Sequence, residues 1–188
     1  RIRIEVRNGG ADAIRILDDG DGFLPEDLPL AFASHATSKL SSVADLDHIG
    51  SLGFRGEALA SIGAVSRARI RSRRHGAMEG WEVTCDGGVE VPPMPCGCPE
   101  GTQIDIRDLF YNVPARRKFL RAERTELSHI EDWLRTLALA RPDVELRVAH
   151  NGKASRRWKG EAQLQEGSML SDVRLHEALG EDFARNAL

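Results

Sequence analysis

The sequence predicts an α+β fold, a two-layer sandwich in which a mostly antiparallel sheet carries helices on one face. Short segments of alternating apolar and charged residues, separated by glycine turns, predict the strands. Segments with apolar residues three to four positions apart predict the helices. The chain has 188 residues, 41% of them apolar and 29% charged, which suits one domain of ordinary size with the start of a second.

The first part of the chain predicts two antiparallel strands followed by two short helices. Apolar and charged residues alternate over 1–7 and again over 13–17, and Asn8-Gly9-Gly10 between them is typical of a hairpin turn. Residues 25–32 begin with proline and two acids and carry apolar residues one turn apart, which predicts a short helix. A second short helical pattern, over 43–49, leads into a glycine-rich segment.

The middle of the chain predicts further strands. Residues 67–73 alternate, and arginines at every second position give this strand a basic face that we expect to be solvated. Residues 81–91 predict strands around the turn Asp86-Gly87-Gly88. We expect a loop over 92–99, before a further strand over 101–109.

The last part of the chain predicts helices around a second hairpin. Residues 114–120 begin a helical region, and apolar residues spaced by three to four over 125–140 predict the longest helix. Alternation on both sides of Asn151-Gly152, within 144–158, predicts two strands joined by a tight turn. A polar linker follows, before a small helix within 171–183.

The composition narrows the class of protein. A net charge of −3 argues against a strongly basic nucleic-acid-binding module. No apolar run approaches the ~20 residues of a membrane-spanning helix, and no signal-peptide pattern opens the chain. We therefore expect a cytoplasmic protein that binds no membrane. Cys85, Cys96 and Cys98 are odd in number and lack zinc-finger spacing, which indicates buried or incidental thiols.

A glycine-rich segment at 51–63 organises the chain. Gly53 and Gly56 can take backbone angles closed to other residues, so successive amides can converge on phosphate oxygens. A helix starting near Gly56 would direct its first N–H groups to the same place, and its small residues would let it lie close to a sheet. No Gly-Lys-Ser/Thr follows, so this is not a Walker A loop. Taken alone, the segment equally suits an ordinary loop before a helix.

Three other patterns suit a nucleotide. Asp18, at a strand end before Gly20 and Gly22, can accept a hydrogen bond from an exocyclic amine such as adenine N6. Residues 37–39, Thr-Ser-Lys, offer two hydroxyls and an ammonium for phosphate or metal-bound phosphate. Thr102, directly after a glycine, can place its hydroxyl beside the Asp18 carboxylate from a neighbouring strand. The ordinary alternatives are an acidic turn, a polar helix end and a strand-favouring threonine.

The order and identity of these patterns carry more information than each alone. The chain contains, in order, Ile16-Leu17-Asp18-Asp19-Gly20-Asp21-Gly22, His35-Ala36-Thr37-Ser38-Lys39, Ser51-Leu52-Gly53-Phe54-Arg55-Gly56-Glu57-Ala58-Leu59-Ala60-Ser61, Gly101-Thr102 and Asp108-Leu109-Phe110-Tyr111-Asn112-Val113-Pro114-Ala115-Arg116-Arg117-Lys118-Phe119-Leu120. Over nearly the whole chain, these strings closely resemble the N-terminal ATPase region of the MutL family of DNA mismatch repair proteins. The strings at 53–59 and 110–119 separate this group from its superfamily relatives, the type II topoisomerase ATPase domains, heat-shock chaperones and sensor histidine kinases.

The resemblance implies a Bergerat-type ATP site of the GHKL superfamily. Asp18 would be the aspartate that binds adenine, helped by Thr102 and a water molecule. The base pocket would be shaped by Gly20, Gly22 and Phe23. The phosphates would lie along Thr37, Ser38 and Lys39, and they would be wrapped by backbone amides of Gly53, Phe54, Arg55, Gly56, Glu57, Ala58 and Leu59.

The resemblance also implies what the longer protein does. In the family, a general-base glutamate and a magnesium-binding asparagine precede the first strand, so we expect the longer protein to hydrolyse ATP with Mg²⁺ and this chain alone to be inactive. Residues 1–160 would be the ATPase domain without its first helices, and 161–188 a linker toward a second, transducer domain. Slow hydrolysis would switch homodimer formation and contacts with DNA, the mismatch-recognition protein MutS and other repair proteins.

A second interpretation treats the same scaffold as a DNA- or protein-interaction module that does not hydrolyse ATP. Its contacts would come from one cluster of cations: Arg116, Arg117, Lys118, Arg121 and Arg124. A solvated helix face is the ordinary explanation of such a cluster, and we expect DNA binding to be weak at physiological salt. Asp86, in a predicted surface turn, should take no part in nucleotide binding.

Overall fold

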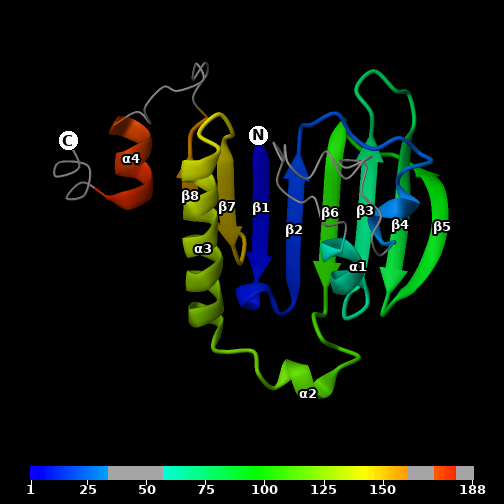
Figure 1. Ribbon diagram of the computed structural model, residues 1–188, viewed down its shortest axis with the longest axis horizontal. Helices are drawn as coiled ribbons and strands as arrows, with labels where there is room; N and C mark the ends of the chain where they lie inside the picture. The colour runs from blue at the N-terminus through cyan, green and yellow to red at the C-terminus, as the bar shows by residue number, and fades with distance from the viewer. Residues whose placement is uncertain (34–56, 161–171, 181–188) are drawn as a thin grey trace, which may run out of the picture. The chain divides into compact units, whose positions relative to one another are not determined.

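The computed structural model describes residues 1–33, 57–160 and 172–180, and the chain divides into two compact units (Figure 1). The first unit is made of Arg1–Asp18 and Leu120–Leu188, and the second of Asp19–Phe119. Each unit is built of strands with helical segments packed on one face. The predicted α+β fold is therefore confirmed.

The described strands of the first unit form a mixed sheet in the order β2-β1-β7-β8. β1 (Ile2–Arg7) and β2 (Ala13–Asp18) are antiparallel, as the hairpin pattern predicts. β7 (Leu146–His150) runs parallel to β1, and β8 (Lys153–Trp158) returns antiparallel to β7. The β1–β7 pair joins strands that are far apart in the sequence, because parallel neighbours need a long crossover connection.

The turn between β1 and β2 is a short 3₁₀ helix, η1 (Asn8–Gly10), whose three residues are left-handed. Their φ angles are 48°, 60° and 95°, and asparagine and glycine tolerate this conformation best. A Cβ atom on Gly9 would lie 2.8 Å from the carbonyl oxygen of Glu123, the first residue of α3 (Glu123–Ala140). The glycine is thus required both for the turn and for its close approach to α3.

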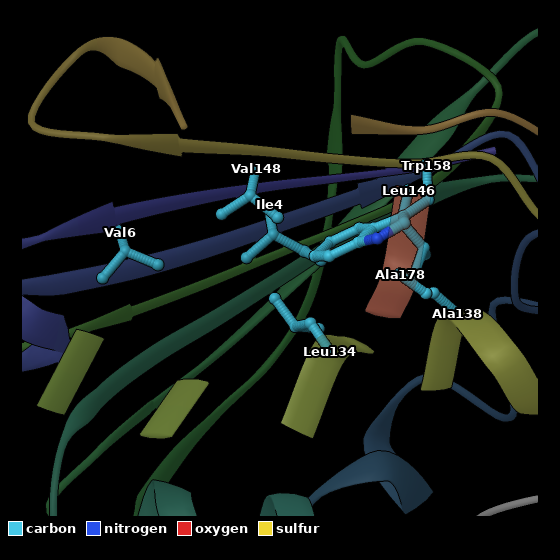
Figure 2. Packing of buried hydrophobic residues seen from close by; sticks show 8 residues of the cluster. All are labelled: Ile4, Val6, Leu134, Ala138, Leu146, Val148, Trp158 and Ala178. Atoms are coloured by element: carbon cyan, nitrogen blue, oxygen red, sulfur yellow. The ribbon is translucent and has the colours of Figure 1, made fainter. Parts of the chain in front are cut away.

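The core of the first unit lies between its sheet and the helices α3 and α4 (Asp172–Leu179). β1 and β7 each direct alternate apolar side chains to one face, where α3 covers them (Figure 2). Trp158 ends β8 in this core, and its indole N–H donates to the carbonyl oxygen of Glu177 in α4, at 3.2 Å. The buried side chains are Ile4, Val6, Leu134, Ala138, Leu146, Val148, Trp158 and Ala178.

The described strands of the second unit are antiparallel and follow the order β5-β4-β3-β6. β3 (Arg67–Arg73) lies in the middle, between β4 (Gly80–Asp86) and β6 (Gly101–Arg107). β5 (Val89–Cys96) pairs with the outer side of β4. The glycine turn predicted at 86–88 therefore joins β4 to β5.

One face of this second sheet is apolar and lies beneath η2 (Pro29–Ala31) and α1 (Ala58–Gly63). A Cβ atom on Gly63 would lie 2.9 Å from the sulfur of Cys85, so α1 approaches the sheet closely, as its small residues predict. Leu28 and Phe32 are buried here, as their spacing predicts. The buried cluster consists of Leu28, Phe32, Ala68, Ile70, Val83 and Cys85.

The opposite face of the same sheet carries charged side chains, and its inner arginines form ion pairs with carboxylates of the neighbouring strands. Arg69 lies 3.5 Å from Asp105 and 3.7 Å from Glu82, and Arg71 reaches the same two carboxylates at 3.8 and 3.9 Å. Asp105 is only 4% exposed, and a buried carboxylate requires such partners. The expectation of a solvated basic face is therefore wrong, because cross-strand carboxylates neutralise the inner arginines.

Two local predictions are also wrong. Residues 25–32 do not form an α-helix but a turn followed by the 3₁₀ helix η2, because Pro29 has no N–H with which to continue an α-helical ladder. The segment 92–99 is not a loop throughout, since β5 continues to Cys96. The three prolines within β5, at 92, 93 and 95, are tolerated because an edge strand can leave N–H positions unpaired.

The remaining helix predictions within the described residues are confirmed. α2 (Pro114–Arg117) begins the helical region, α3 covers the predicted long helix, and α4 lies within the predicted 171–183. Within residues 1–33, 57–160 and 172–180, no helix has both the length and the apolar character needed to cross a membrane.

Candidate functional site

The structure describes about half of the predicted site residues. Those with described positions are Asp18, Gly20, Gly22, Phe23, Glu57, Ala58, Leu59 and Thr102. Those outside the described residues are Thr37, Ser38, Lys39, Gly53, Phe54, Arg55 and Gly56. The geometry of the site is accordingly built from the loop that follows β2, from α1 and from β6.

Asp18 is the last residue of β2 and is half-buried, as expected for a carboxylate presented at a strand end. It pairs with Ile2 in the antiparallel ladder of the first unit. The other described site residues belong to the second unit, which begins at Asp19. Gly20 is exposed in the loop that follows.

Gly22 brings this loop against the end of β3. Its φ angle is +73°, and a Cβ atom would lie 2.5 Å from the carbonyl oxygen of Arg73. Only glycine tolerates both the left-handed backbone and this approach. One residue earlier, the carbonyl oxygen of Asp21 accepts a hydrogen bond from the His75 amide at 3.3 Å. The loop backbone is thus held to β3 at two adjacent points.

Ser72 joins this loop to the strand that carries Thr102. Its hydroxyl oxygen accepts a hydrogen bond from the Phe23 amide at 2.8 Å and donates to the carbonyl oxygen of Gly101 at 3.0 Å. The Thr102 hydroxyl lies 3.2 Å away and is the donor toward Ser72, because a serine hydroxyl has one hydrogen to give. Phe23 and Thr102 are therefore brought together through one side chain.

Ser72 is the functional-site residue that the sequence analysis missed. It is 2% exposed and occupies the same face of β3 as the buried Ala68 and Ile70. A polar residue at an apolar position of an alternating strand is the signal that could have identified it, because buried hydroxyls need hydrogen-bond partners.

α1 begins within the glycine-rich segment 51–63 and close to residue 56, as predicted. Ala58 is its first residue, and the carbonyl oxygen of Glu57 accepts the Ser61 amide at 3.0 Å. Leu59 packs against the buried cluster of the second unit, whereas Glu57 and Ala58 are exposed. The first turn of α1 thus anchors the Leu59 side chain in the core, while Glu57, directly before the helix, lies at the surface.

The far end of α1 is fixed by two turns, the glycine turn after β4 and the Phe-Tyr-Asn loop after β6. These turns donate hydrogen bonds to the four consecutive carbonyl oxygens of 63–66, so the carbonyl groups at and after the end of the helix have partners. The pairs are Gly88 N to Gly63 O at 3.0 Å, Asn112 Nδ2 to Ala64 O at 2.9 Å, Phe110 N to Val65 O at 2.7 Å and Gly87 N to Ser66 O at 3.0 Å. The Phe-Tyr-Asn string therefore positions α1.

A polar cluster ties these two turns together. The Tyr111 hydroxyl donates to the Asp86 carboxylate, and this hydrogen bond raises the pKa of the phenol. The Arg67 guanidinium lies 4.4 Å from the centre of the Tyr111 ring and donates to Asp108 at 2.7 Å, which raises the pKa of Arg67. Asp86 is therefore not an inert turn residue, because it holds the loop against β4.

Three cationic residues follow this loop and have no ion-pair partner in the part of the chain that the structure describes. Arg116, Arg117 and Lys118, in and after α2, are exposed, and none of the three forms an ion pair with a described residue. Phe119 directly follows them and is 83% exposed. The other two cations of the predicted cluster, Arg121 and Arg124, belong to the first unit.

A surface hollow of about 550 Å³ lies beside the loop in the second unit. Phe23 is the one predicted site residue that lines it, together with Ser72. Its other walls are Leu24, Pro25, Arg74, Gly76, Ala77, Met78, Glu79 and Trp81. The described part of the chain contains no group of three or more His, Cys, Asp or Glu side chains able to hold a metal ion, so no magnesium ligand is assigned there.

Comparison with known proteins shows which proteins the chain resembles. No protein-family model matches the chain. A curated DNA mismatch repair protein MutL from Xanthomonas oryzae pv. oryzae is 58% identical over all 188 residues, and one from Xylella fastidiosa is 54% identical over the same span. Over its whole length, the chain is similar to part of these MutL proteins. It spans 29% of the length of these MutL relatives.

Solved structures agree with this assignment. The MutL ATPase domain of Aquifex aeolicus, complexed with ADP, matches with a TM-score of 0.70 and 28% identity, over 94% of this chain and 60% of that one. The N-terminal domain of a DNA repair protein matches with a TM-score of 0.69 at 20% identity, over 95% of this chain and 51% of that one, and supports the fold alone. The predicted resemblance to the ATPase region of MutL is confirmed.

Proposed function

We propose that this chain is the ATP-binding region of a MutL-type mismatch repair protein, in which ATP binding and slow hydrolysis switch dimerisation and partner contacts. The observation that carries the proposal is the Ser72 hydroxyl, which fixes the Phe23 backbone beside Thr102. This is the arrangement that a base pocket built from the loop after Asp18 and from β6 would need. The ADP complex of the related Aquifex domain supports an adenine nucleotide as the ligand.

Asp18 is proposed to select the base. An ionised carboxylate only accepts hydrogen bonds, so it matches the exocyclic amine of adenine. Guanine presents a carbonyl oxygen at the corresponding ring position, which would set two acceptors against each other. Thr102 is proposed to assist through a water molecule, and the glycines at 20 and 22 to let the ring approach the backbone.

The phosphates are proposed to lie along Thr37, Ser38 and Lys39 and against the backbone of 53–59. The described part of this proposal is α1, whose first turn follows that backbone and whose far end is held by the Phe-Tyr-Asn loop. Mg²⁺ is proposed to accompany ATP, supplying positive charge at the phosphates. We propose 1–160 as the ATPase domain and 161–188 as the approach to a transducer domain.

The whole protein is proposed to act in the cytoplasm as a homodimer that contacts MutS, other repair proteins and DNA. Equilibrium binding of ATP, ADP and GTP to the full-length protein tests the nucleotide assignment. Adenine nucleotides should bind at least about tenfold more tightly than GTP, the factor that about 1.4 kcal/mol of discrimination gives. Equal affinity for ATP and GTP would contradict the proposed base pocket.

A second candidate function is supported by the unpaired cations of α2. Arg116, Arg117 and Lys118 carry no described carboxylate partner, unlike the arginines of β3, and the exposed Phe119 ring adjoins them. Cations next to an exposed aromatic ring suit a single strand of nucleic acid, whose phosphates and unstacked bases they can contact. The cluster is therefore proposed as a weak DNA contact.

Titration of a fluorescent single-stranded oligonucleotide at several salt concentrations tests this contact. We expect weak binding that falls as salt rises, because phosphate contacts release counterions. The variant Arg116→Ala/Arg117→Ala should bind more weakly with a smaller salt slope. Lys153→Ala, at the start of β8, removes one exposed cation elsewhere and serves as the control. Submicromolar binding at physiological salt that is lost in the double variant would mean that the weak-contact assignment underrates the cluster.

A further inference from the structure

The end of β5 brings two cysteines to one place on the second sheet. Cys96 is the last residue of β5, and its ladder partner on β4 is Gly80. Cys98 follows after the exposed Gly97. Residues two apart in an extended chain point to the same side, so the sequence Cys-Gly-Cys directs both thiols toward one face of the sheet.

Gly80 makes room for the second thiol. The sulfur of Cys98 occupies the position that a side chain on residue 80 would take. That position is directly across the ladder from Cys96, and side chains placed across an antiparallel ladder have Cβ atoms about 4.5–5.5 Å apart. The Cys98 sulfur therefore lies on the same side of the sheet as the Cys96 side chain and close to it.

The surroundings of the pair distinguish its two members. Cys96 lies on the charged face of the sheet, near Glu82 and Arg71. Burial, and then the neighbouring Cys98 thiol, raise the pKa of Cys96 to about 11. A thiolate rather than a thiol is the nucleophile, so the raised pKa disfavours Cys96 as the first attacking group. Both side chains are half-exposed and unbridged, so a small reagent can reach them.

We propose that Cys96 and Cys98 form a vicinal dithiol that low-molecular-weight disulfides oxidise to an intramolecular disulfide. The Cys98 thiolate attacks one sulfur of the small disulfide, forming a mixed disulfide and releasing one small thiolate. Cys96 then attacks the Cys98 sulfur, the ring closes and the second small thiolate leaves. The released thiolates take up the two protons, so the protein loses two hydrogens and the small disulfide is reduced to two thiols.

This dithiol is a modification site separate from the proposed nucleotide site, and it does not depend on that function. Disulfides of reducing compartments are transient and report on redox state. Closing the ring would fix the chain that leaves the edge strand β5, next to the Arg71–Glu82 contact at 3.9 Å. Cys85, which is 3% exposed in the apolar cluster, stands apart as an unreactive thiol.

The test is equilibration of the full chain with mixtures of oxidised and reduced glutathione, followed by alkylation and mass spectrometry. We expect one product that lacks two hydrogens, with the bridge in the peptide containing both cysteines and with Cys85 still alkylated after unfolding. Phenylarsine oxide, a reagent for paired thiols, should bind with one-to-one stoichiometry. Accumulation of mixed glutathione disulfides without ring closure, or of disulfide-linked dimers, would overturn the proposal.

Three variants sharpen the result. Cys96→Ser should stop at a mixed glutathione disulfide on Cys98. Gly80→Ala places a methyl group where the Cys98 sulfur lies, and it should lower the equilibrium constant for ring closure roughly tenfold, a shift of about 30 mV. Gly97→Ala adds the same methyl group in open space and should close the ring as the wild type does. Ring closure in Gly80→Ala equal to that in Gly97→Ala would refute the geometry.

Discussion

Replacing Ser72 by alanine removes the hydroxyl that connects the loop after β2 to β6. The substitution keeps the backbone and the Cβ atom, and alanine fits the apolar face that Ser72 shares with Ala68 and Ile70. What is lost is the set of three contacts to the Phe23 amide, the Gly101 carbonyl oxygen and the Thr102 hydroxyl, at 2.8, 3.0 and 3.2 Å. Their loss should affect both stability and the proposed base pocket.

The size of the change in unfolding free energy depends on how many of these groups can hydrogen-bond to water after the substitution. A hydrogen bond contributes about 1 kcal/mol net, and leaving a buried donor unpaired costs about 1–3 kcal/mol. Ser72 and Thr102 are 2% and 9% exposed, so the groups around the lost hydroxyl are poorly placed to bind water instead. We expect Ser72→Ala to lower the free energy of unfolding by about 2–3 kcal/mol.

Urea unfolding followed by circular dichroism measures this change. Ser128→Ala is the matched control, because Ser128 is exposed in α3 and alanine is the better helix former there. Ser72→Ala should also weaken ATP binding by the full-length protein, since the Phe23 backbone and Thr102 lose their common partner. A change in unfolding free energy below about 0.5 kcal/mol, the size of an ordinary surface substitution, would refute this reasoning.

Three further substitutions or conditions test the description of each unit. Gly22→Ala should destabilise the protein by at least about 1–2 kcal/mol in thermal unfolding, because an alanine in the left-handed conformation is strained. Its Cβ atom would also lie 2.5 Å from the Arg73 carbonyl oxygen. A variant as stable as the wild type would contradict this prediction. The Arg174 guanidinium donates to five carbonyl oxygens, those of Ala138, Arg141, Pro142, Val144 and Lys159. Arg174→Met leaves these oxygens without their donor and should lower the free energy of unfolding in urea by at least about 3 kcal/mol. Arg174→Lys should lower it by a smaller amount. The Arg141 guanidinium lowers the pKa of Asp143, as those of Arg147 and Arg157 lower the pKa of Glu145. The stabilisation that these ion pairs contribute is therefore present above about pH 4–4.5, where the carboxyl groups of the unfolded chain are ionised. It is lost as the pH falls through the pKa values of the folded protein, which are lower. When the free energy of unfolding is measured from pH 7 to 3, Asp143→Asn should lose less stability than the wild type as the pH falls. An equal dependence of stability on pH in the two proteins would contradict the ion-pair assignment.

Local signals predicted the elements whose cause is local. The β1–β2 hairpin follows from Asn8-Gly9-Gly10, because left-handed residues at the turn reverse the chain. The β7–β8 hairpin follows in the same way from Asn151-Gly152. α3 follows from the spacing of its apolar residues. Each of these features is determined by residues that lie close together in the sequence.

The features that the sequence did not reveal depend on distant partners. The parallel β1–β7 pair joins segments over 100 residues apart, so no turn residue announces it. The arginines of β3 look solvated in sequence because their carboxylate partners, Glu82 and Asp105, lie on other strands. Arg174 lies in a polar segment, and its burial depends on carbonyl oxygens supplied by α3 and the loop after it.

In the candidate site, too, some residues were predicted from local patterns and others depend on partners that are distant in the sequence. The resemblance implies Asp18, Phe23 and Thr102 as site residues, whereas it does not point to Ser72, which links the last two. That Asp86 takes no part in nucleotide binding stays a prediction, but Asp86 is a poor control position, because it accepts a hydrogen bond from Tyr111 and lies 3.5 Å from Arg67. A substitution there would disturb the loop that holds α1.

The most direct measurement of the central claim is the calorimetric affinity of the full-length protein for ATP in Asp18→Asn and Asp21→Asn. Both changes replace a carboxylate by an amide in the same loop region, but Asp21 has an exposed side chain and no proposed role in base recognition. Asp18→Asn should weaken ATP binding by roughly 1–3 kcal/mol, the cost of a lost charged hydrogen bond, while Asp21→Asn should bind ATP as the wild type does. Equal ATP affinity in Asp18→Asn and wild type would mean that the base pocket lies elsewhere.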